Sequence, residues 1–269
     1  VFTANPEDYT ARGKIITPLK DRIGSEVRTH YPVALEHGEA ITEQEAWTDR
    51  ESDLVLPRYV REVVEGIAFA ARRDKKIDGR SGVSQRLPIT ALENAVSNAE
   101  RRGLLAGEAP IVPRVSDIYA ALPSLTGKFE LEYEGEMVGA EAVARELIRH
   151  AVGEVFSVYM GGTDFTPVVQ FFESGGSLRI REDSPASEVL GQLHQVPEVL
   201  EHVGLLGVKA EDSAPLLAAA GEFVLEGLWA QKKVGRSDEQ GFVAAERPRD
   251  MEVDLEQLER LRKLKRQVN

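Results

Sequence analysis

Three polar residues in the first third of the chain are of types that take part in phosphoryl transfer. Asn5 lies in TANPE, Arg22 in PLKDRIG and Arg86 in SGVSQR. When a nucleoside triphosphate is hydrolysed, negative charge spreads over the transferred phosphoryl oxygens, so positioned cations and a water-orienting amide supply most of the catalysis. Arginine suits this task because its planar guanidinium stays charged and binds phosphate in a bidentate way. The three residues are therefore candidates for nucleotide chemistry.

The elements that would hold Asn5 and Arg22 follow the pattern strand, polar tip, charged turn, strand. Apolar and small residues lead into Asn5, a glycine-containing loop leads to Arg22, and residues 25–31 are predicted to form a short strand that ends at Pro32. Each residue also has a simpler interpretation. Asn5 before a proline is an ordinary turn starter, and Arg22 could form a surface ion pair with Asp21, which contributes about 0 to 1 kcal/mol.

This opening resembles the second half of an AAA+ ATPase module of the MoxR and magnesium-chelatase I-subunit type. In that family a strand ends in a sensor-1 asparagine, a helix end carries an arginine finger in a pattern like LxDRFG, and a lid helix carries a sensor-2 arginine. The resemblance covers roughly residues 1–105. It implies that Asn5 is the sensor-1 residue, Arg22 the arginine finger and Arg86 the sensor-2 residue, with Arg80 as the alternative if the register of the lid differs.

The resemblance also implies how these residues act. Asn5 would hold the attacking water, and Arg22 would neutralise the charge that develops on the nucleotide of a neighbouring subunit. Arg86 would contact the γ-phosphate from the lid of its own subunit. A cation near a helix start is slightly unfavourable for the helix dipole, and phosphate binding at Arg86 would explain that small cost.

The sequence lacks the motif that binds the phosphates themselves. The loop G-x-x-x-x-G-K-[ST] is absent, since the Gly-Lys pairs at 13–14 and 127–128 are not followed by a hydroxyl residue. No apolar strand ends in an Asp-Glu pair that could hold magnesium. We therefore expect that the chain alone neither binds nor hydrolyses ATP, and that ATP and Mg²⁺ act only in a longer, complete protein that carries the Walker motifs.

A mainly α fold is predicted, with three parts. Apolar residues recur at helical spacing in LPRYVREVVEGIAFAARR, a second helix follows Ser84, and a linker with two prolines lies at 107–113. The predicted parts are the end of an AAA+ α/β core over residues 1–32, a helical lid over 33–112, and a helical C-terminal domain of unknown role over 113–269.

Beyond the linker the sequence contains no motif that we associate with a known activity. Residues 128–133 alternate and predict one short strand, and a long helix is expected from Gly135 or Gly139 to Tyr159. Further helices are predicted over 165–173, 185–194, 197–203 and 214–230, and a flexible connector over 235–250.

The last segment, residues 254–268, predicts a stable helix. Four leucines lie three residues apart, acidic residues come early and basic residues come late, which matches the helix dipole. A stripe at every third residue drifts around the helix, so a long coiled coil is not expected. The segment could pack back onto its own domain, or it could dock on a neighbouring subunit or a partner.

Composition excludes several classes of protein. The formal charge of −12 argues against nonspecific binding to nucleic acid, which needs clustered cations. The absence of cysteine excludes disulfides and Cys-ligated zinc and fits a cytoplasmic location. No apolar run is long enough to suggest a membrane span. The five histidines form no pattern such as H-E-x-x-H, so no metal site is predicted.

Two classes of function remain. The resemblance implies the C-terminal portion of a ring-forming AAA+ ATPase that couples ATP hydrolysis to remodelling of a partner or client protein. It further implies a homo-oligomeric ring and a partner with a von Willebrand A domain. The alternative is a non-enzymatic helical adaptor or scaffold, in which the same arginines are surface residues. Nucleotide-dependent oligomers of the complete protein would distinguish the first class from the second.

Overall fold

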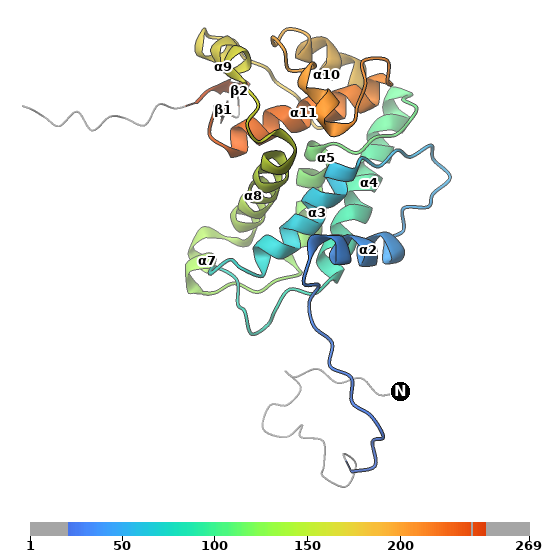
Figure 1. Ribbon diagram of the computed structural model, residues 1–269. Helices are drawn as coiled ribbons and strands as arrows, with labels where there is room; N and C mark the ends of the chain where they lie inside the picture. Colours follow the sequence, from blue (N-terminus) through green and yellow to red (C-terminus); the bar gives the residue numbers. More distant parts are fainter. Residues whose placement is uncertain (1–20, 238, 246–269) are drawn as a thin grey trace, which may run out of the picture.

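Helices make up most of the described chain, and a two-stranded hairpin follows the last of them (Figure 1). The computed structural model describes residues 21–237 and 239–245. The prediction of a mainly α fold is confirmed. In chain order the elements are α2 (Leu35–Glu45), α3 (Arg58–Ala71), α4 (Arg86–Ala106), α5 (Val115–Ala120), α6 (Leu122–Thr126), α7 (Tyr133–Val138), α8 (Ala140–Met160), α9 (Thr166–Glu173), α10 (Ala186–Leu193), the 3-10 helix η2 (His202–Leu206), α11 (Ala214–Ala230), β1 (Val234–Ser237) and β2 (Gly241–Ala244).

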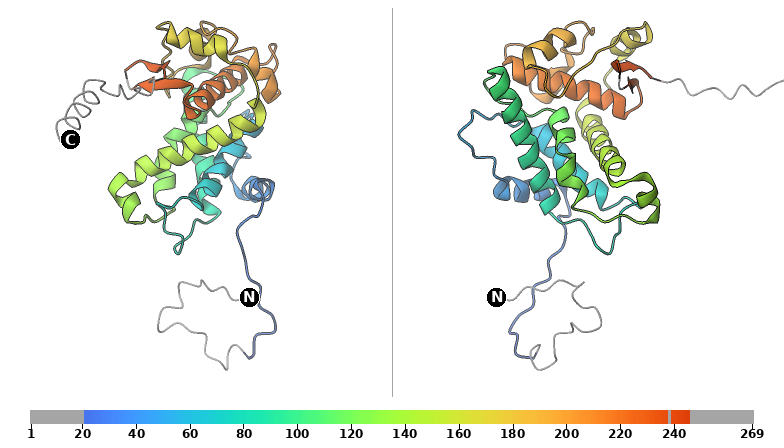
Figure 2. Two further views of the ribbon diagram at one scale, coloured as in Figure 1. Left: turned by 60° about the vertical axis from the view of Figure 1, so that its left-hand side comes forward. Right: turned by 180° about the vertical axis from the view of Figure 1, so that it is seen from behind.

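Helices α3, α8 and α11 form the centre of the molecule. Almost every residue of α3 is buried, because α4 and α8 pack on either side of it, and α8 in turn packs against α11 (Figures 1 and 2). The ring of Tyr59 on α3 lies 4.6 Å from that of Phe223 on α11, and Phe156 on α8 lies 6.2 Å from Phe223. One continuous core of buried side chains extends from Ala46 to Phe242. Residues on both sides of the predicted boundary at 112–113 contribute to it.

Helices α8 and α11 approach each other closely at a glycine. A Cβ atom at Gly227 would overlap the ring of Phe156. The absence of a side chain at this position therefore sets how closely the two helices pack.

A buried ionic cluster joins the C-terminal part of α4 to α5 and α11. Arg102 donates to Asp117 at 2.9 Å, and the backbone N–H of Arg114 donates to the same carboxylate at 2.8 Å. The guanidinium of Arg114 lies 3.4 Å from Glu222, which also accepts the N–H of Ser116 at 2.7 Å. These side chains are almost completely buried. Each buried charge is paired, as the cost of burying a lone charge requires.

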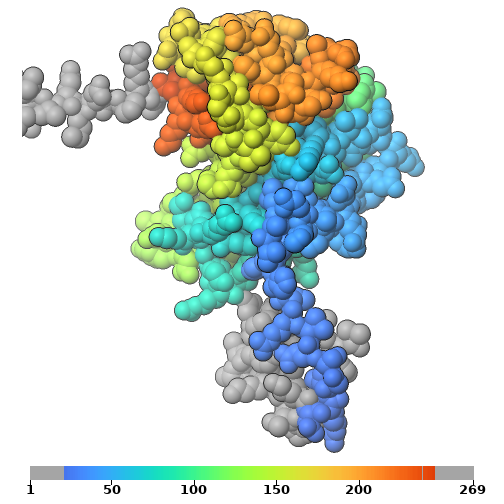
Figure 3. All heavy atoms as spheres, viewed as in Figure 1, coloured from blue at the N-terminus to red at the C-terminus, as the bar shows by residue number. Residues whose placement is uncertain are grey.

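The segment before α2 differs from its prediction. Residues 25–31 were expected to form a strand, but they are exposed and make no strand, and they extend away from the helical body (Figures 1 and 3). A strand needs backbone hydrogen bonds to a neighbour, and within the described ranges the backbone of residues 25–31 makes none, while the side chain of Tyr31 contacts the loop before α4. Residues 1–20, which include Asn5 and the first predicted strand, lie outside the described residues.

The last two thirds of the chain bring three corrections. Residues 128–133 form no strand; Leu131 makes a single bridge to Ile77, and α7 begins at Tyr133. The helix predicted over 197–203 is a series of turns that leads into η2. A flexible connector was predicted over 235–250, but its described part belongs to a hairpin, because Phe242 is buried and exchanges backbone hydrogen bonds with Leu178. Residues 246–250 lie outside the described residues. The helices predicted over 165–173, 185–194 and 214–230 are confirmed as α9, α10 and α11.

Candidate functional site

The two described residues of the predicted site are both exposed. Arg22 lies in the extended segment before α2, and Arg86 is the first residue of α4. The alternative residue Arg80 is also exposed and lies in the loop between α3 and α4, where its N–H donates to Asp78 at 2.8 Å. Asn5 lies outside the described residues. Within the described ranges Arg22 and Arg86 are not in contact, so the structure does not assemble the predicted residues into one site.

Tyr31 connects the segment of Arg22 to the loop before α4. Its hydroxyl accepts the backbone N–H of Val83 at 3.0 Å, and the guanidinium of Arg72 lies 4.4 Å from the centre of its ring. Gly82 adopts φ = 74°, and a Cβ atom there would overlap the Tyr31 hydroxyl. Glycine is therefore required at this turn both for its backbone conformation and for space.

Gln85, the residue before Arg86, is held by side chains from α2 and α3. Its amide donates to both oxygens of Glu65 at 2.8 Å and to the hydroxyl of Thr42 at 3.2 Å, and its carbonyl accepts from Arg72 at 3.0 Å. Glu65 is buried, and Thr42 also donates to it at 3.0 Å. We refer to Tyr31, Thr42, Glu65, Arg72 and Gln85 as the Tyr31–Gln85 cluster. It fixes the start of α4 relative to α2 and α3.

The electrostatics of this cluster follow from burial. Desolvation raises the pKa of Glu65, and hydrogen bonds from Gln85 and Thr42 oppose that rise. Desolvation also lowers the pKa of Arg72, against the attraction of Glu65. The two opposite charges therefore stabilise each other in a place that water reaches poorly. Gln85 bridges the two side chains by hydrogen bonds, so a neutral residue at either position would remove both their attraction and one hydrogen bond of Gln85.

Arg86 was predicted from the sequence, whereas the residues that hold it in place were not. The contacts of Gln85 with Glu65 and Thr42 join residues 20 and 43 positions apart, and no spacing rule connects them. The spacing of residues gives no signal for Glu65, because this residue lies on the side of the helix opposite Val63, Val64 and Ile67. It is buried because α2 packs over that side, where Thr42 donates to it.

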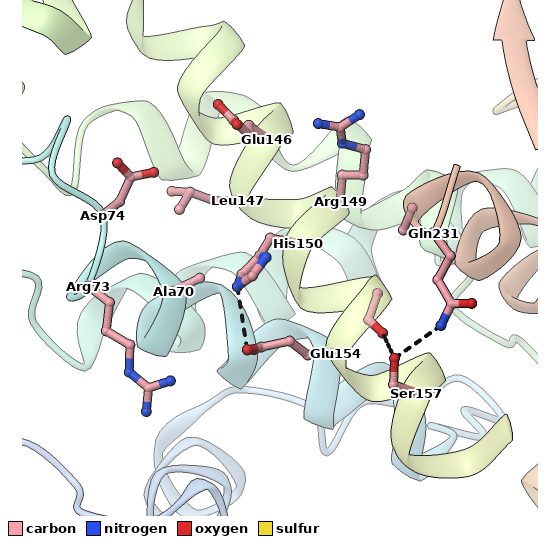
Figure 4. Close-up of a pocket in the computed structure, with 12 residues that line it drawn as sticks. Ala70, Arg73, Asp74, Glu146, Leu147, Arg149, His150, Glu154, Ser157 and Gln231 are labelled. Atoms are coloured by element: carbon pink, nitrogen blue, oxygen red, sulfur yellow. Dashed lines mark hydrogen bonds and ion pairs between the residues drawn. The ribbon is translucent and has the colours of Figure 1, made fainter. Parts of the chain in front are cut away.

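A second feature is an open groove of about 460 Å³ between α3, α8 and α11. Figure 4 shows Asp74 on one side of it and Ser157 and Gln231 on the other. His150 pairs with Glu154 at 3.4 Å, but the hydroxyl of Ser157 donates to the carbonyl of Gly153 at 2.8 Å and accepts from Gln231 at 3.1 Å. Ser157 is thus not activated by a histidine, as a nucleophile would be.

Metal binding and membrane insertion find no support in the described parts of the chain. In residues 21–237 and 239–245 no three His, Asp or Glu side chains converge where a metal ion could bind. None of the helices described there combines the length and apolar character that a membrane crossing requires.

Comparison with protein-family models, with curated proteins and with solved structures finds no match for this chain. The function must therefore be argued from its own residues.

Proposed function

We propose that this chain is the C-terminal portion of a ring-forming AAA+ ATPase of the MoxR and magnesium-chelatase-like type. Such a motor would couple ATP hydrolysis to remodelling of a partner or client protein, and α2, α3 and α4 would form its lid. The observation that supports this proposal is the Tyr31–Gln85 cluster. It joins the segment that carries Arg22 to the start of α4, where the exposed Arg86 lies.

In this proposal the cluster transmits the state of the nucleotide. Arg86 would reach the γ-phosphate of ATP bound to the nucleotide-binding half of its own subunit. A shift of α4 would then move Gln85 and Arg72, and through Tyr31 the segment of Arg22. Arg22 would act as an arginine finger on the neighbouring subunit, as in other phosphoryl-transfer motors. ATP and Mg²⁺ would be bound by the phosphate loop of the complete protein, and a von Willebrand A domain protein is the proposed partner.

The first test replaces the proposed arginine finger. In the complete protein, Arg22→Ala should lower the rate of ATP hydrolysis by about 10³-fold or more. ATP binding should stay near normal, because the finger acts mainly on the transition state. The matched control is Arg28→Ala, which changes an exposed arginine of the same segment. Equal turnover of wild type and Arg22→Ala would exclude this role.

The second test replaces the proposed sensor. Arg86→Ala should weaken ATP binding by about 10- to 100-fold, the effect of losing one charge-assisted hydrogen bond, and should lower turnover as well. The control is Arg101→Ala, at an exposed position of the same helix. Titration with a fluorescent ATP analogue measures the affinity. If Arg86→Ala binds like wild type and Arg80→Ala does not, the sensor is Arg80.

The alternative is a non-enzymatic helical adaptor. It is favoured by the absence of a phosphate loop from the sequence and by the exposed apolar side chains of α7. Sedimentation of the complete protein separates the two proposals. The motor should form larger oligomers when ATP is added, whereas the adaptor should sediment identically with and without nucleotide.

A further inference from the structure

The groove between α3, α8 and α11 continues to α7. Glu146, at one end of the groove, accepts a hydrogen bond from Lys76 Nζ at 2.8 Å. The backbone carbonyl of Lys76 accepts the N–H of Glu132 at 2.8 Å, immediately before α7. Hydrogen bonds of Lys76 therefore connect the Glu146 end of the groove to the start of α7, while Gln231 lies at its other end.

Helix α7 carries exposed apolar side chains, and exposed glutamates surround them. Tyr133 and Met137 are each 75% exposed, and Val138 is exposed beside them. The four glutamates at 130, 132, 134 and 136 are exposed around these side chains. We refer to this surface as the α7 knob. Large apolar side chains gathered in this way suggest a docking surface, and the glutamates favour a basic occupant.

The described chain ends beside the other end of the same groove. Ala244 pairs with Val234, three residues after Gln231, and Gln231 donates to Ser157 near the C-terminal end of α8. Residues 254–268 follow in the sequence, outside the described residues. Their four leucines come with acidic residues at 254, 256 and 259 and with basic residues at 260, 262, 263, 265 and 266.

The chain is long enough for residues 254–268 to reach α7. Helix α8 has 21 residues and is therefore about 32 Å long. Residues 246–253 span up to about 28 Å when extended, and a helix from 254 to 264 adds about 16 Å. If residues 254–264 form the helix that the sequence predicts, these lengths together exceed that of α8, so no second copy of the chain is needed.

The charges of residues 254–268 also complement those of the surface along which the segment would lie. The groove residue Arg149 lies about 14 Å along α8 from the start of that helix, which is where the acidic start of a segment that ends on α7 would lie. At the far end, the α7 glutamates lie where its basic residues would lie. We propose that residues 254–268 dock in the groove of their own chain, with Leu261 and Leu264 on the apolar side chains of the α7 knob and the neighbouring basic residues on its glutamates. This proposal does not depend on the ATPase function.

Cross-linking of the full chain tests the proposal, and the absence of native cysteine makes the reaction specific. Met137→Cys combined with Leu264→Cys should react with a short bismaleimide within one chain, about tenfold or more faster than a control pair. The control is Leu104→Cys with Leu264→Cys, because Leu104 is 78% exposed but lies on α4, away from α7 (Figure 1). Intact mass and peptide mapping identify the product. Equal rates for the two pairs, or a link mainly between two chains, would overturn the proposal.

A charge exchange tests the part of the proposal that concerns the glutamates. Glu134→Lys with Glu136→Lys should slow the Met137–Leu264 cross-link, and adding Lys263→Glu with Lys265→Glu should restore its rate. Circular dichroism establishes that each variant is folded; all these positions of α7 are exposed. A damaged helix could not regain the cross-linking rate when the charges are exchanged, so a restored rate supports the charge pairing. A rate that stays low in the exchanged variant would contradict it.

Discussion

Glu226 lies on α11 in the interior of the molecule, 2% exposed. Burial raises the pKa of its carboxyl group to about 7, more than the nearby Arg236 lowers it, and Glu222 adds to the rise. Arg236 forms an ion pair with Glu226, and its guanidinium lies 5.2 Å from the ring centres of both Trp229 and Phe242. The folded protein therefore binds a proton at Glu226 more tightly than the unfolded chain does.

This difference predicts how stability depends on pH. Between the ordinary carboxyl pKa near 4.5 and the folded value of about 7, the folded state holds more protons than the unfolded state, so stability should fall as pH rises. The loss from this group is at most about 3.5 kcal/mol, at about 1.4 kcal/mol per pKa unit. Glu226→Gln should flatten that part of the curve, as measured by urea unfolding at several pH values.

The control for this experiment is Glu141→Gln, at an exposed position of α8. It should leave the slope of stability against pH unchanged. If Glu226→Gln shows the same slope as wild type, Glu226 is ionised in the folded protein throughout this range and its pKa is not raised.

Among the elements, helices with clear apolar periodicity could be predicted from the sequence. Helices α3, α4 and α8 to α11 are of this kind, because each buries a stripe that the spacing reveals. The hairpin could not be predicted, since Phe242 is held by Leu178, a residue far away in the sequence. The contacts of the candidate site could not be predicted for the same reason. Arg86 resembles a motif residue, whereas Tyr31, Glu65 and Gln85 come together only after α2, α3 and α4 have packed.

The contact between α8 and α11 leads to a prediction at Gly227. Gly227→Ala should destabilise the protein by about 1 to 3 kcal/mol, because the added methyl group overlaps the Phe156 ring. The control is Gly191→Ala in α10, where a Cβ atom meets no neighbour within 4 Å. That change should stabilise by about 0.5 to 1 kcal/mol through helix propensity and unfolded-state entropy. Urea midpoints measure both, and a neutral Gly227→Ala would show that the helices separate at little cost.

For the molecule as a whole, the continuous core predicts cooperative unfolding across residue 113. The chain has two tryptophans, Trp47 after α2 and Trp229 on α11, one on each side of that position. Fluorescence of Trp47→Phe and of Trp229→Phe should therefore give coincident urea transitions. Far-ultraviolet circular dichroism of both variants checks that neither replacement alters stability by itself. Two separate midpoints would indicate a lid and a C-terminal domain that unfold independently.

The buried cluster around Asp117 has a consequence for how this sequence can evolve. Asp117 accepts from Arg102, from the Arg114 backbone and from Asn98, while the Arg114 side chain depends on Glu222. Loss of one partner in a buried pair costs about 3 to 5 kcal/mol, whereas replacing both partners by apolar residues is often neutral. Because Arg102 also pairs with Glu108 and Asp117 also accepts from Asn98, relatives of this chain should keep or lose these four residues together, and intermediates should be rare.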